Sequence, residues 1–272
     1  MANTALVWIR DDFRIQNNDA LTYASNQHDI VTAVFIFNSN IFDHKREAQK
    51  WWVSKSLENF KSDLKKLNIG LEIIKDDEIN FFSKIKSNSK ISVYWNKVYE
   101  PTELEKDKKI GTDFSKKNID FKFFKGNVLN EYNKITKNDG TPFKVYSPFW
   151  RNAEQFYLER LPDKISKVKK CKKINTLFKN QIKSEYILPK SDWYKKFEKY
   201  WVPSEQKAHE NLDSFVNKSI LNYGVDRDFP SIKGTSLLSP YIRNGQINVG
   251  DIWQKCKKLK SNNVSIKKYT NE

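Results

Sequence analysis

The chain has 272 residues, of which 38% are hydrophobic and 14% aromatic, and its formal net charge is +16. This composition is typical of a folded protein and excludes an intrinsically disordered one. No run of about 18 apolar residues occurs, which excludes a membrane-spanning helix, and the N-terminus lacks the layout of a signal peptide. The charge suits a polyanionic partner such as DNA, but a bias towards lysine would raise it without any partner.

Cysteine and histidine are scarce. The two cysteines, Cys171 and Cys256, offer no disulfide framework, and without a signal peptide the cytosol is the expected compartment. The three histidines, His28, His44 and His209, share no metal-like spacing with the cysteines. We therefore expect no metal site.

The first half of the chain alternates strand-like runs with helical patterns. The predicted strands, rich in Val, Ile, Phe and Tyr, are Ala5–Arg10, Ile30–Phe37, Leu71–Lys75, Ile91–Asn96 and Ile119–Phe124. The clearest helix covers about Glu47–Leu67, where apolar residues recur at steps of three and four, and Pro101 starts another. Repeated strand–helix–strand units predict an α/β fold with a doubly wound, parallel, five-stranded sheet. Such sheets bind ligands at the carboxyl ends of their strands.

Glycine is missing where two common nucleotide-binding motifs need it. The first glycine of the chain is Gly70, so no Gly-x-Gly-x-x-Gly loop and no P-loop can follow the first strand. This disfavours an NAD-dependent dehydrogenase and a nucleotide kinase.

The pattern changes beyond the fifth strand. Gly126–Tyr146 is rich in Asn, Lys, Asp and Gly and predicts a loop, and a short helix follows over about Trp150–Arg160. Residues from Leu161 to about Tyr200 have weak periodicity and predict a connector. Its basic part, Arg160–Lys183, is interpreted as a solvated, lysine-rich linker.

Helical signals return near residue 201. Ser204 is the predicted N-cap of a helix, and two short helical segments follow at about Ser239–Asn244 and Val249–Lys260. These changes divide the chain into an α/β domain over 1–130, a connector over 131–200 and a helical segment over 201–272.

One segment of the helical part combines features that suit a phosphate. Gly234 forms a turn before three hydroxyl residues, Thr235, Ser236 and Ser239, and Pro240 stands at the expected first turn of a helix. A helix start exposes unpaired N–H groups and partial positive charge, which favour a bound phosphate. The same spacing also fits an ordinary helix capped by Ser or Thr. From spacing alone both interpretations stay open.

A resemblance bears on that choice. Tyr223-x-x-x-Arg227-Asp-x-Pro, followed by Gly234-Thr-Ser-x-Leu-Ser-Pro, resembles the start of the flavin-binding domain of the DNA photolyase/cryptochrome family. The remaining matches are similar to earlier landmarks of that family and lie in the same order: Leu6-Val-Trp-Ile-Arg10-Asp-Asp-Phe-Arg14, Asn18-Asp-Ala-Leu21, Lys50-Trp51, Ser56-Leu-Glu-Asn59, Tyr94-Trp-Asn96, Tyr99-Glu100-Pro101 and Lys144-Val-Tyr-Ser-Pro-Phe-Trp-Arg151.

The resemblance implies an N-terminal antenna domain, a connector and the first helices of an all-α FAD-binding domain. It implies light-driven repair of cyclobutane pyrimidine dimers in UV-damaged DNA, with reduced FAD as electron donor and an antenna pigment, commonly the reduced folate methenyltetrahydrofolate. The family continues well beyond this length, so we expect a truncated, monomeric, cytoplasmic photolyase whose catalytic residues lie in the missing region. Two alternatives stay open: a cryptochrome-like photoreceptor without repair activity, and a free-standing nucleotide-binding protein.

The family motif also assigns candidate binding residues. The FAD candidates are Tyr223, Thr235, Ser236, Leu237, Leu238 and Ser239, and the antenna-folate candidate is Glu103. Alternatively, Tyr223 is a core residue and Glu103 is an acid favoured by the dipole of its helix.

Further landmarks have structural interpretations. The charged residues Arg10, Asp12 and Arg14 match the family, but we interpret them as ion pairs that hold the end of a strand. The tryptophans are expected to pack in the core of the antenna domain; they are Trp51, Trp52, Trp95 and Trp150.

Overall fold

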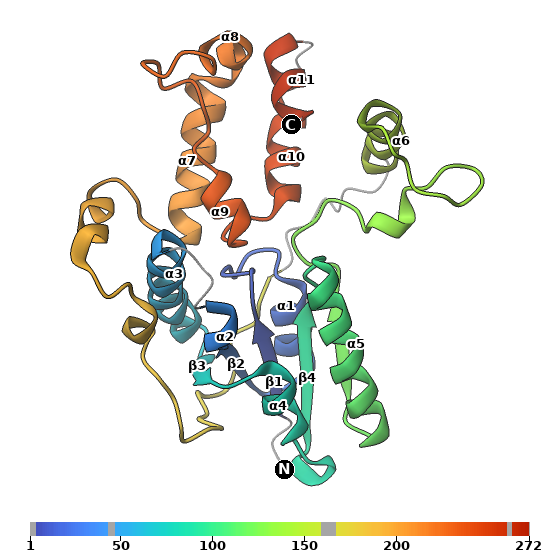
Figure 1. Ribbon diagram of the computed structural model, residues 1–272, viewed down its shortest axis with the longest axis vertical. Helices are drawn as coiled ribbons and strands as arrows, with labels where there is room; N and C mark the ends of the chain where they lie inside the picture. The colour runs from blue at the N-terminus through green and yellow to red at the C-terminus, as the bar shows by residue number, and fades with distance from the viewer. Residues whose placement is uncertain (1–3, 43–46, 159–166, 260–262, 272) are drawn as a thin grey trace.

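The computed structural model describes residues 4–42, 47–158, 167–259 and 263–271, and its N-terminal part is built around a parallel sheet (Figure 1). The five strands are β1 (Thr4–Ile9), β2 (Ile30–Phe37), β3 (Gly70–Lys75), β4 (Ile91–Asn96) and β5 (Phe121–Phe124). Their order is β3-β2-β1-β4-β5, every neighbouring pair is parallel, and β1 lies at the centre. Each predicted strand is present, so the predicted parallel sheet is confirmed.

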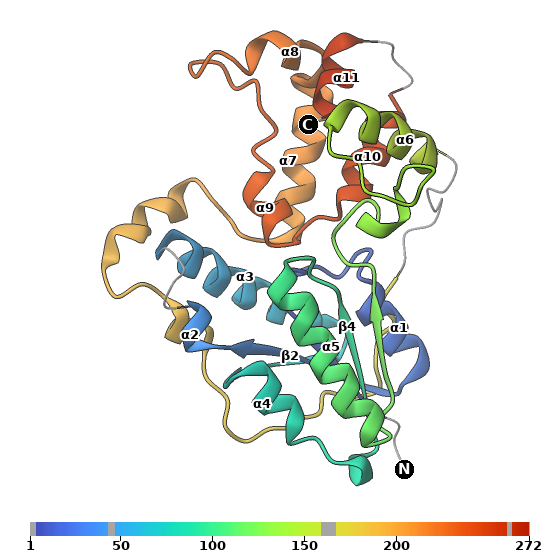
Figure 2. The same cartoon turned by 45° about the vertical axis from the view of Figure 1, so that its right-hand side comes forward.

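Helices cover both faces of this sheet (Figure 2). The helices α1 (Asp19–Gln27) and α3 (Glu47–Lys66) pack on one face, and α4 (Glu78–Ser83) and α5 (Pro101–Lys116) pack on the other. Because side chains alternate along a strand, β1 directs Val7 to the first face and Trp8 to the second, and both are buried. The doubly wound arrangement is therefore confirmed as well.

Local sequence explains where these helices begin. The Asn18 side chain caps α1 by accepting a hydrogen bond from the Leu21 backbone N–H at 3.1 Å. Pro101 opens α5 as predicted, at a position where a missing N–H costs no helical hydrogen bond. The short helices α2 (Ser39–Phe42) and α4 were not predicted, because such brief segments show no helical period.

The connector, as far as residues 167–183 describe it, lies along the sheet and is held there by backbone hydrogen bonds. The backbone N–H of Cys171 donates to the Leu67 carbonyl at 2.9 Å, and that of Ile182 donates to the Ile73 carbonyl at 2.8 Å. The second bond pairs the connector with the outer edge of β3, an edge that would otherwise expose unpaired backbone groups. The lysines of residues 167–183 are exposed, as a solvated, lysine-rich linker requires, but these backbone bonds hold the segment against the sheet. Residues 159–166 lie outside the described residues. The short 3₁₀ helices η3 (Ser184–Ile187) and η4 (Asp192–Lys199) follow.

The tryptophans correct a second expectation. Of the four, Trp95 alone packs within the two clusters that flank the sheet, whereas Trp51 and Trp52 project from α3 into the core of the C-terminal helices. The helix α6 (Tyr146–Leu158) begins before its predicted start and carries Trp150, whose ring meets Trp253 edge to face with centroids 5.4 Å apart. Three of these side chains thus support the C-terminal helices.

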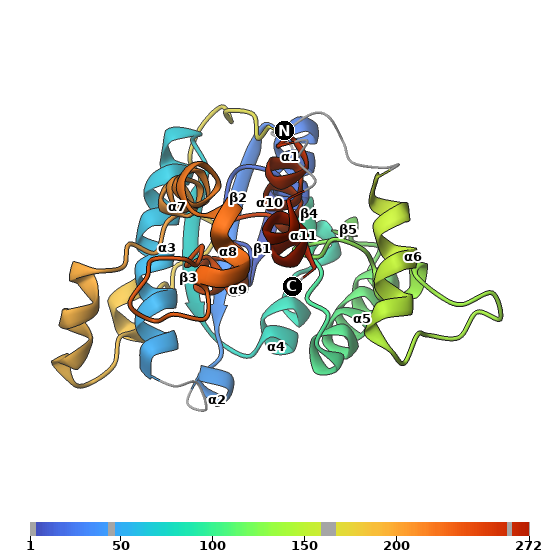
Figure 3. The ribbon, with the colours of Figure 1, turned by 90° about the horizontal axis from the view of Figure 1, so that it is seen from above.

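The C-terminal helices stand over the carboxyl ends of the strands (Figures 1 and 3). They are α7 (Glu205–Lys218), α8 (Tyr223–Asp226), α9 (Ser239–Arg243), α10 (Val249–Lys257) and α11 (Val264–Thr270), with η5 (Ile220–Asn222) before α8. Ser204 caps α7 as predicted, because its side chain accepts a bond from the Lys207 N–H at 3.2 Å. Trp51 and Trp52 complete the core of these helices, which share one apolar cluster with α3.

The loop after β1, residues 11–18, joins the two parts of the molecule, and we call it the docking loop. The Glu205 carboxylate accepts hydrogen bonds from the backbone N–H groups of Ile15 and Gln16 at 2.7 and 2.8 Å. The buried Arg14 guanidinium donates to the Gly245 carbonyl at 2.9 Å. The docking loop therefore donates hydrogen bonds to both α7 and the turn after α9.

The predicted charged trio has structural contacts, but not as one cluster. Arg10 pairs with Asp107 on α5 at 2.9 Å. The buried Asp12 carboxylate accepts instead from the Asn96 amide at 2.7 Å. Arg14 bonds to backbone carbonyls, as described above. Asp12 also accepts from the Arg10 backbone N–H at 2.8 Å, and both residues bond to Asn96. The trio therefore ties the end of β1 to α5, to β4 and to the turn after α9.

Candidate functional site

The predicted phosphate segment is held by a close backbone contact. A Cβ atom on Gly234 would lie 2.5 Å from the Asp226 Cβ atom and 2.7 Å from its carbonyl carbon, so only glycine fits there. Leu237 has a φ of +54°, in the left-handed region that non-glycine residues seldom adopt. Leu238 is 1% exposed and anchors the segment in the apolar core. The turn is therefore fixed on both sides of its hydroxyl groups.

The predicted hydroxyl cap is absent from this part of the structure. The N-cap position of α9 is Leu238, and no side chain among the described residues caps that helix. Pro240 does stand in the first turn of α9, as expected. The interpretation as an ordinary helix capped by Ser or Thr is therefore wrong, because α9 starts at Ser239, one residue earlier than a cap by Ser239 requires.

The hydroxyl groups line a cavity instead. Its volume is about 660 Å³, and we call it the hydroxyl pocket. Five of the six predicted flavin residues line it, namely Tyr223, Thr235, Ser236, Leu237 and Ser239. The sixth, Leu238, points into the core. The opposite wall comes from α10 and α11, with Trp253, Cys256 and Tyr269 among its residues.

Tyr223 is both a core residue and part of the pocket wall. Its ring is 7% exposed and packs edge to face on Phe215 and Tyr269, with centroids 5.7 and 5.0 Å away. Its hydroxyl accepts a hydrogen bond from the Arg227 guanidinium at 3.1 Å. The Arg227 guanidinium, which also pairs with Asp228 at 3.6 Å, therefore lies beside a residue of the pocket wall without lining the pocket itself.

Sequence reasoning left two residues near this site unassigned, and one of them, Tyr269, lines the pocket. Arg227 was visible as part of the Tyr-x-x-x-Arg motif, and the i, i+4 spacing of Tyr223 and Arg227 is the signal that places them on one helical turn. Tyr269 gave no signal, because α11 was not recognised. Burial raises the pKa of Tyr269 to about 12, against the opposing effect of a hydrogen bond with Ser236. The phenol therefore stays neutral at physiological pH and can donate a hydrogen bond into the pocket.

Glu103 lies at a different place, at the carboxyl end of β1. Its carboxylate pairs with Arg10 at 3.3 Å and with Lys106 at 2.7 Å. It borders a small cavity of about 100 Å³, which shares no residue with the hydroxyl pocket. A larger cavity of about 480 Å³ between the sheet and the C-terminal helices is lined by Tyr99, Glu100 and other residues, but not by Glu103. Both oxygens of Glu103 are thus engaged in ion pairs.

Two further findings concern metal binding and membrane crossing. Within the described ranges, no group of three or more His, Cys, Asp or Glu side chains is placed to hold a metal ion. No helix in those ranges combines the length and apolar character that a membrane crossing requires.

Comparisons with known proteins agree with this architecture. A family model described as DNA photolyase matches residues 5–167. The deoxyribodipyrimidine photo-lyase of Agrobacterium fabrum is 30% identical over 265 residues, which cover 96% of this chain and 55% of that protein. Cryptochrome-2 of Arabidopsis thaliana is 24% identical over 272 residues, covering 96% of this chain and 44% of that protein.

A solved structure extends the similarity to the fold. The crystal structure of a bacterial class III photolyase from Agrobacterium tumefaciens superposes with a TM-score of 0.87 and 29% identity, covering 100% of this chain and 57% of that one. The chain thus spans about half the length of the curated relatives it matches. Because the family model matches more than half of its residues, the chain belongs to the DNA photolyase family.

Proposed function

We propose that the chain contributes the antenna domain and the first flavin-binding helices of a deoxyribodipyrimidine photolyase, a lyase that repairs cyclobutane pyrimidine dimers in UV-damaged DNA. The observation that carries this proposal is the hydroxyl pocket, which gathers residues from Tyr223 to Ser239 around one cavity. Bound reduced FAD would supply the light-driven electron for repair, and the protein would position it. The proposed setting is a monomer in the cytoplasm.

The residues of the pocket fit the diphosphate of FAD. Thr235, Ser236 and Ser239 offer hydroxyl donors along one wall. Arg227 adds a guanidinium beside Tyr223, and such a group suits an anionic phosphate oxygen. The strained backbone at Leu237 lies in the same wall, and strain of this kind concentrates at binding sites. Leu237 and Leu238 would contribute backbone N–H groups and anchorage.

An antenna pigment, a reduced folate such as methenyltetrahydrofolate, completes the proposal, with Glu103 as a contact. The support is positional: Glu103 lies at the carboxyl end of the central strand, where doubly wound sheets bind ligands. Because Glu103 already pairs with Arg10 and Lys106, a folate contact would have to share one of its carboxylate oxygens.

A cryptochrome-like photoreceptor is the second candidate. The similarity to Cryptochrome-2 covers 96% of this chain, the same share as the similarity to the photo-lyase of Agrobacterium fabrum. Both candidates need the same flavin, so the hydroxyl pocket supports them equally.

The test of the flavin pocket is FAD binding to the purified chain, measured by calorimetry. In the double variant Ser236→Ala/Ser239→Ala we expect affinity to fall by about tenfold or more, because each lost hydrogen bond to a charged group is worth about 1.5–3 kcal/mol. The control is Ser231→Ala, an exposed serine outside the pocket in the same loop. Equal affinity of the double variant and the control would reject the pocket.

A second measurement separates the two candidate functions. The protein as cells make it, purified with its flavin, is illuminated with visible light together with UV-irradiated DNA. Light-dependent loss of pyrimidine dimers is the result expected of a photolyase. A flavin that responds to light while the dimers persist would favour the photoreceptor.

A further inference from the structure

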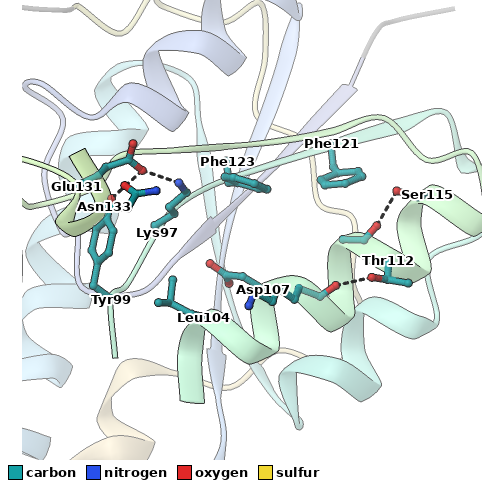
Figure 4. Close-up of a pocket in the computed structure, with 12 residues that line it drawn as sticks. Lys97, Tyr99, Leu104, Asp107, Thr112, Ser115, Phe121, Phe123, Glu131 and Asn133 are labelled. Atoms are coloured by element: carbon teal, nitrogen blue, oxygen red, sulfur yellow. Dashed lines mark hydrogen bonds and ion pairs between the residues drawn. The ribbon is translucent and has the colours of Figure 1, made fainter. Parts of the chain in front are cut away.

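Two cavities beside the sheet differ in their charge. The first, of about 420 Å³ between α5 and β5, is lined by two lysines and two acids, and Lys97 pairs there with Glu131 at 2.5 Å (Figure 4). The second, of about 720 Å³, lies between α4, the segment before β4 and the connector, and we call it the connector cavity. Four lysines and one aspartate line it, so its charge is positive.

The one acid in the lining of the connector cavity already has its partners. The Asp76 carboxylate accepts a hydrogen bond from the Lys84 ammonium at 2.7 Å. It also accepts from the Asn80 amide at 2.7 Å and from the Asp77 backbone N–H at 2.8 Å. Asp76 therefore offsets the charge of Lys84 and leaves the other three lysines of the lining without a carboxylate.

These three lysines come from three different segments. They are Lys75 at the end of β3, Lys86 after α4 and Lys179 in the connector, and all are exposed. Among the residues that the structure describes, none of them forms an ion pair. Lys75 donates to the Tyr186 hydroxyl at 2.6 Å, which holds the ammonium in place without neutralising it. An anion that lies in the cavity would therefore be attracted from three sides.

The floor of the connector cavity is apolar and rigid. Phe81 of α4 and Phe178 of the connector meet edge to face, with ring centroids 4.9 Å apart. Ile85 and Leu177 extend this apolar surface. Behind it, the buried Glu72 carboxylate accepts from the backbone N–H groups of Leu177 and Phe178 at 2.7 and 2.9 Å, which fixes the wall. Even with Glu72 counted, lysines outnumber acids around the cavity.

This combination fits an acidic peptide better than a nucleic acid. Backbone phosphates would satisfy the lysines, but they carry no apolar side chain to cover the floor. Single strands stack their bases on accessible rings, whereas Phe81 is only 5% exposed. An extended peptide of alternating acidic and apolar residues directs carboxylates to one side and apolar side chains to the other.

We propose that the connector cavity docks an acidic, extended peptide segment of a partner protein. Its carboxylates meet Lys75, Lys86 and Lys179, and an apolar side chain covers the floor. The inference does not depend on the flavin proposal, because the connector cavity shares no lining residue with the hydroxyl pocket and its test needs neither flavin nor light.

The probe is a short fluorescent peptide of alternating glutamate and leucine, and fluorescence anisotropy measures its binding to the purified chain. Two matched peptides separate the contributions of charge and apolar contact: one replaces glutamate by glutamine, and the other replaces leucine by serine. Each should bind about tenfold more weakly or worse, because one lacks the ion pairs and the other lacks a buried leucine.

A pair of double variants tests the lysines. Lys86→Ala/Lys179→Ala should weaken the glutamate–leucine peptide about three- to tenfold, the size of two exposed ion pairs. The control Lys61→Ala/Lys65→Ala removes the same charge from α3, on the other face of the sheet. This control should leave the affinity unchanged, and equal losses in the two double variants would reduce the effect to net charge and overturn the inference.

A second pair of variants fills the cavity without removing a charge. Ser89 and Ser87 are both exposed in the 3₁₀ helix η1 (Ser87–Ser89), but only Ser89 lines the cavity. Ser89→Trp should weaken the glutamate–leucine peptide at least about tenfold, because the indole takes the place of the apolar side chain. Ser87→Trp should bind it as the parent chain does, and identical affinities of the two variants would contradict the proposed site.

Hydrogen exchange locates the bound peptide independently. Protection of residues 84–91 and 177–180 would support the connector cavity, and protection confined to other segments would overturn the inference. Undamaged duplex DNA is the competing probe. If Lys86→Ala/Lys179→Ala weakens binding of this DNA and leaves binding of the peptide unchanged, the surface is a nucleic-acid contact and the inference is wrong.

Discussion

At the scale of single residues, the most constrained position of the candidate site is a glycine without a positive φ. Gly234 is buried against Asp226, and any β-carbon would overlap backbone as well as side-chain atoms. Flexible side-chain ends can move aside at small cost, but backbone atoms cannot. The hydroxyl residues that follow are therefore positioned by a steric fit rather than by a hydrogen-bonded cap.

Gly234→Ala is accordingly expected to lower the free energy of unfolding by about 1–3 kcal/mol, the range for overpacked sites. The measurement is urea denaturation, combined with hydrogen exchange of residues 234–239, which should become faster. Ser231→Ala, in the same loop but exposed, should stay within about 0.5 kcal/mol of the parent chain. A stability loss no larger than that of the control would show that the turn can relax.

The free energy of unfolding should depend on pH through the single residue His209. Burial lowers the pKa of His209 below its usual value of 6.5, although the nearby Asp251 and Asp213 act in the opposite direction and Lys255 assists the shift. The unfolded chain therefore takes up a proton at higher pH than the folded chain does. Stability contributed by neutral His209 is full above about pH 6.5 and is lost as the pH falls through the folded pKa.

The variant His209→Gln removes this titration. The difference in unfolding free energy between the parent and His209→Gln should shrink as the pH is lowered from 7.5 to 5, measured by urea denaturation at each pH. Comparing the two curves cancels the contributions of other titrating groups, such as His28, whose pKa is also lowered by burial. Parallel curves would contradict the assignment.

At the scale of elements, one carboxylate links α7 to the docking loop. Glu205 stands in the first turn of its helix, where the dipole favours an acid, yet its oxygens reach two backbone N–H groups of a distant loop. If Glu205 only stabilised the start of α7, another polar residue could replace it at little cost in stability. Here, a neutral amide would leave one of the two N–H groups without its acceptor.

Glu205→Gln should therefore cost about 1–3 kcal/mol, the penalty for a buried donor that loses its acceptor. Hydrogen exchange should accelerate at Ile15 and Gln16 before other amides of the N-terminal part. The control Glu210→Gln lies on the same helix, but its carboxylate is exposed and, among the residues that the structure describes, bonds to Lys207 and Gln206. If both variants lose the same stability, the link between α7 and the loop contributes nothing.

These contacts also explain which elements the sequence could predict. A continuous apolar run identifies strands such as β2 in the sequence, and regular apolar spacing identifies α3. One wall of the hydroxyl pocket could be assembled from the sequence because Tyr223 and the residues of 235–239 belong to one motif. The bonds of Glu205 join residues about 190 positions apart, and Tyr269 enters the pocket from a helix too short to show a period. No local pattern encodes such pairings.

At the scale of the whole molecule, α3 belongs to two cores at once. Phe60 and Leu64 face the sheet, whereas Trp51 and Trp52 face the C-terminal helices. The small helices α8, α9 and α11 bury few apolar residues of their own. The helix α9 packs through Tyr241 on Trp52 of α3, whereas α8 and α11 pack on α7. The sheet and the C-terminal helices should therefore unfold as one cooperative unit.

Trp52 is the side chain on which this coupling depends most. Its indole N–H donates to the Gln246 side chain at 2.9 Å, and its ring contacts Trp201 and Tyr241 with centroids 5.6 and 5.0 Å away. Trp52→Ala should cost about 3–5 kcal/mol, the range for large aromatic residues in cores. The loss should fall on the C-terminal helices, which would then unfold at lower urea than the sheet.

Hydrogen exchange resolved by segment along a urea series reads this uncoupling directly. The control is Phe60→Ala on the same helix, because Phe60 is equally buried but packs against Phe13 in the sheet core. Phe60→Ala should destabilise the chain by a similar amount while both parts still open together. In Trp52→Ala, the amides of α7 and α10 should exchange at urea concentrations where those of β1 and β2 remain protected. If all four elements lose protection together in that variant, the two parts are coupled through the docking loop and not through α3.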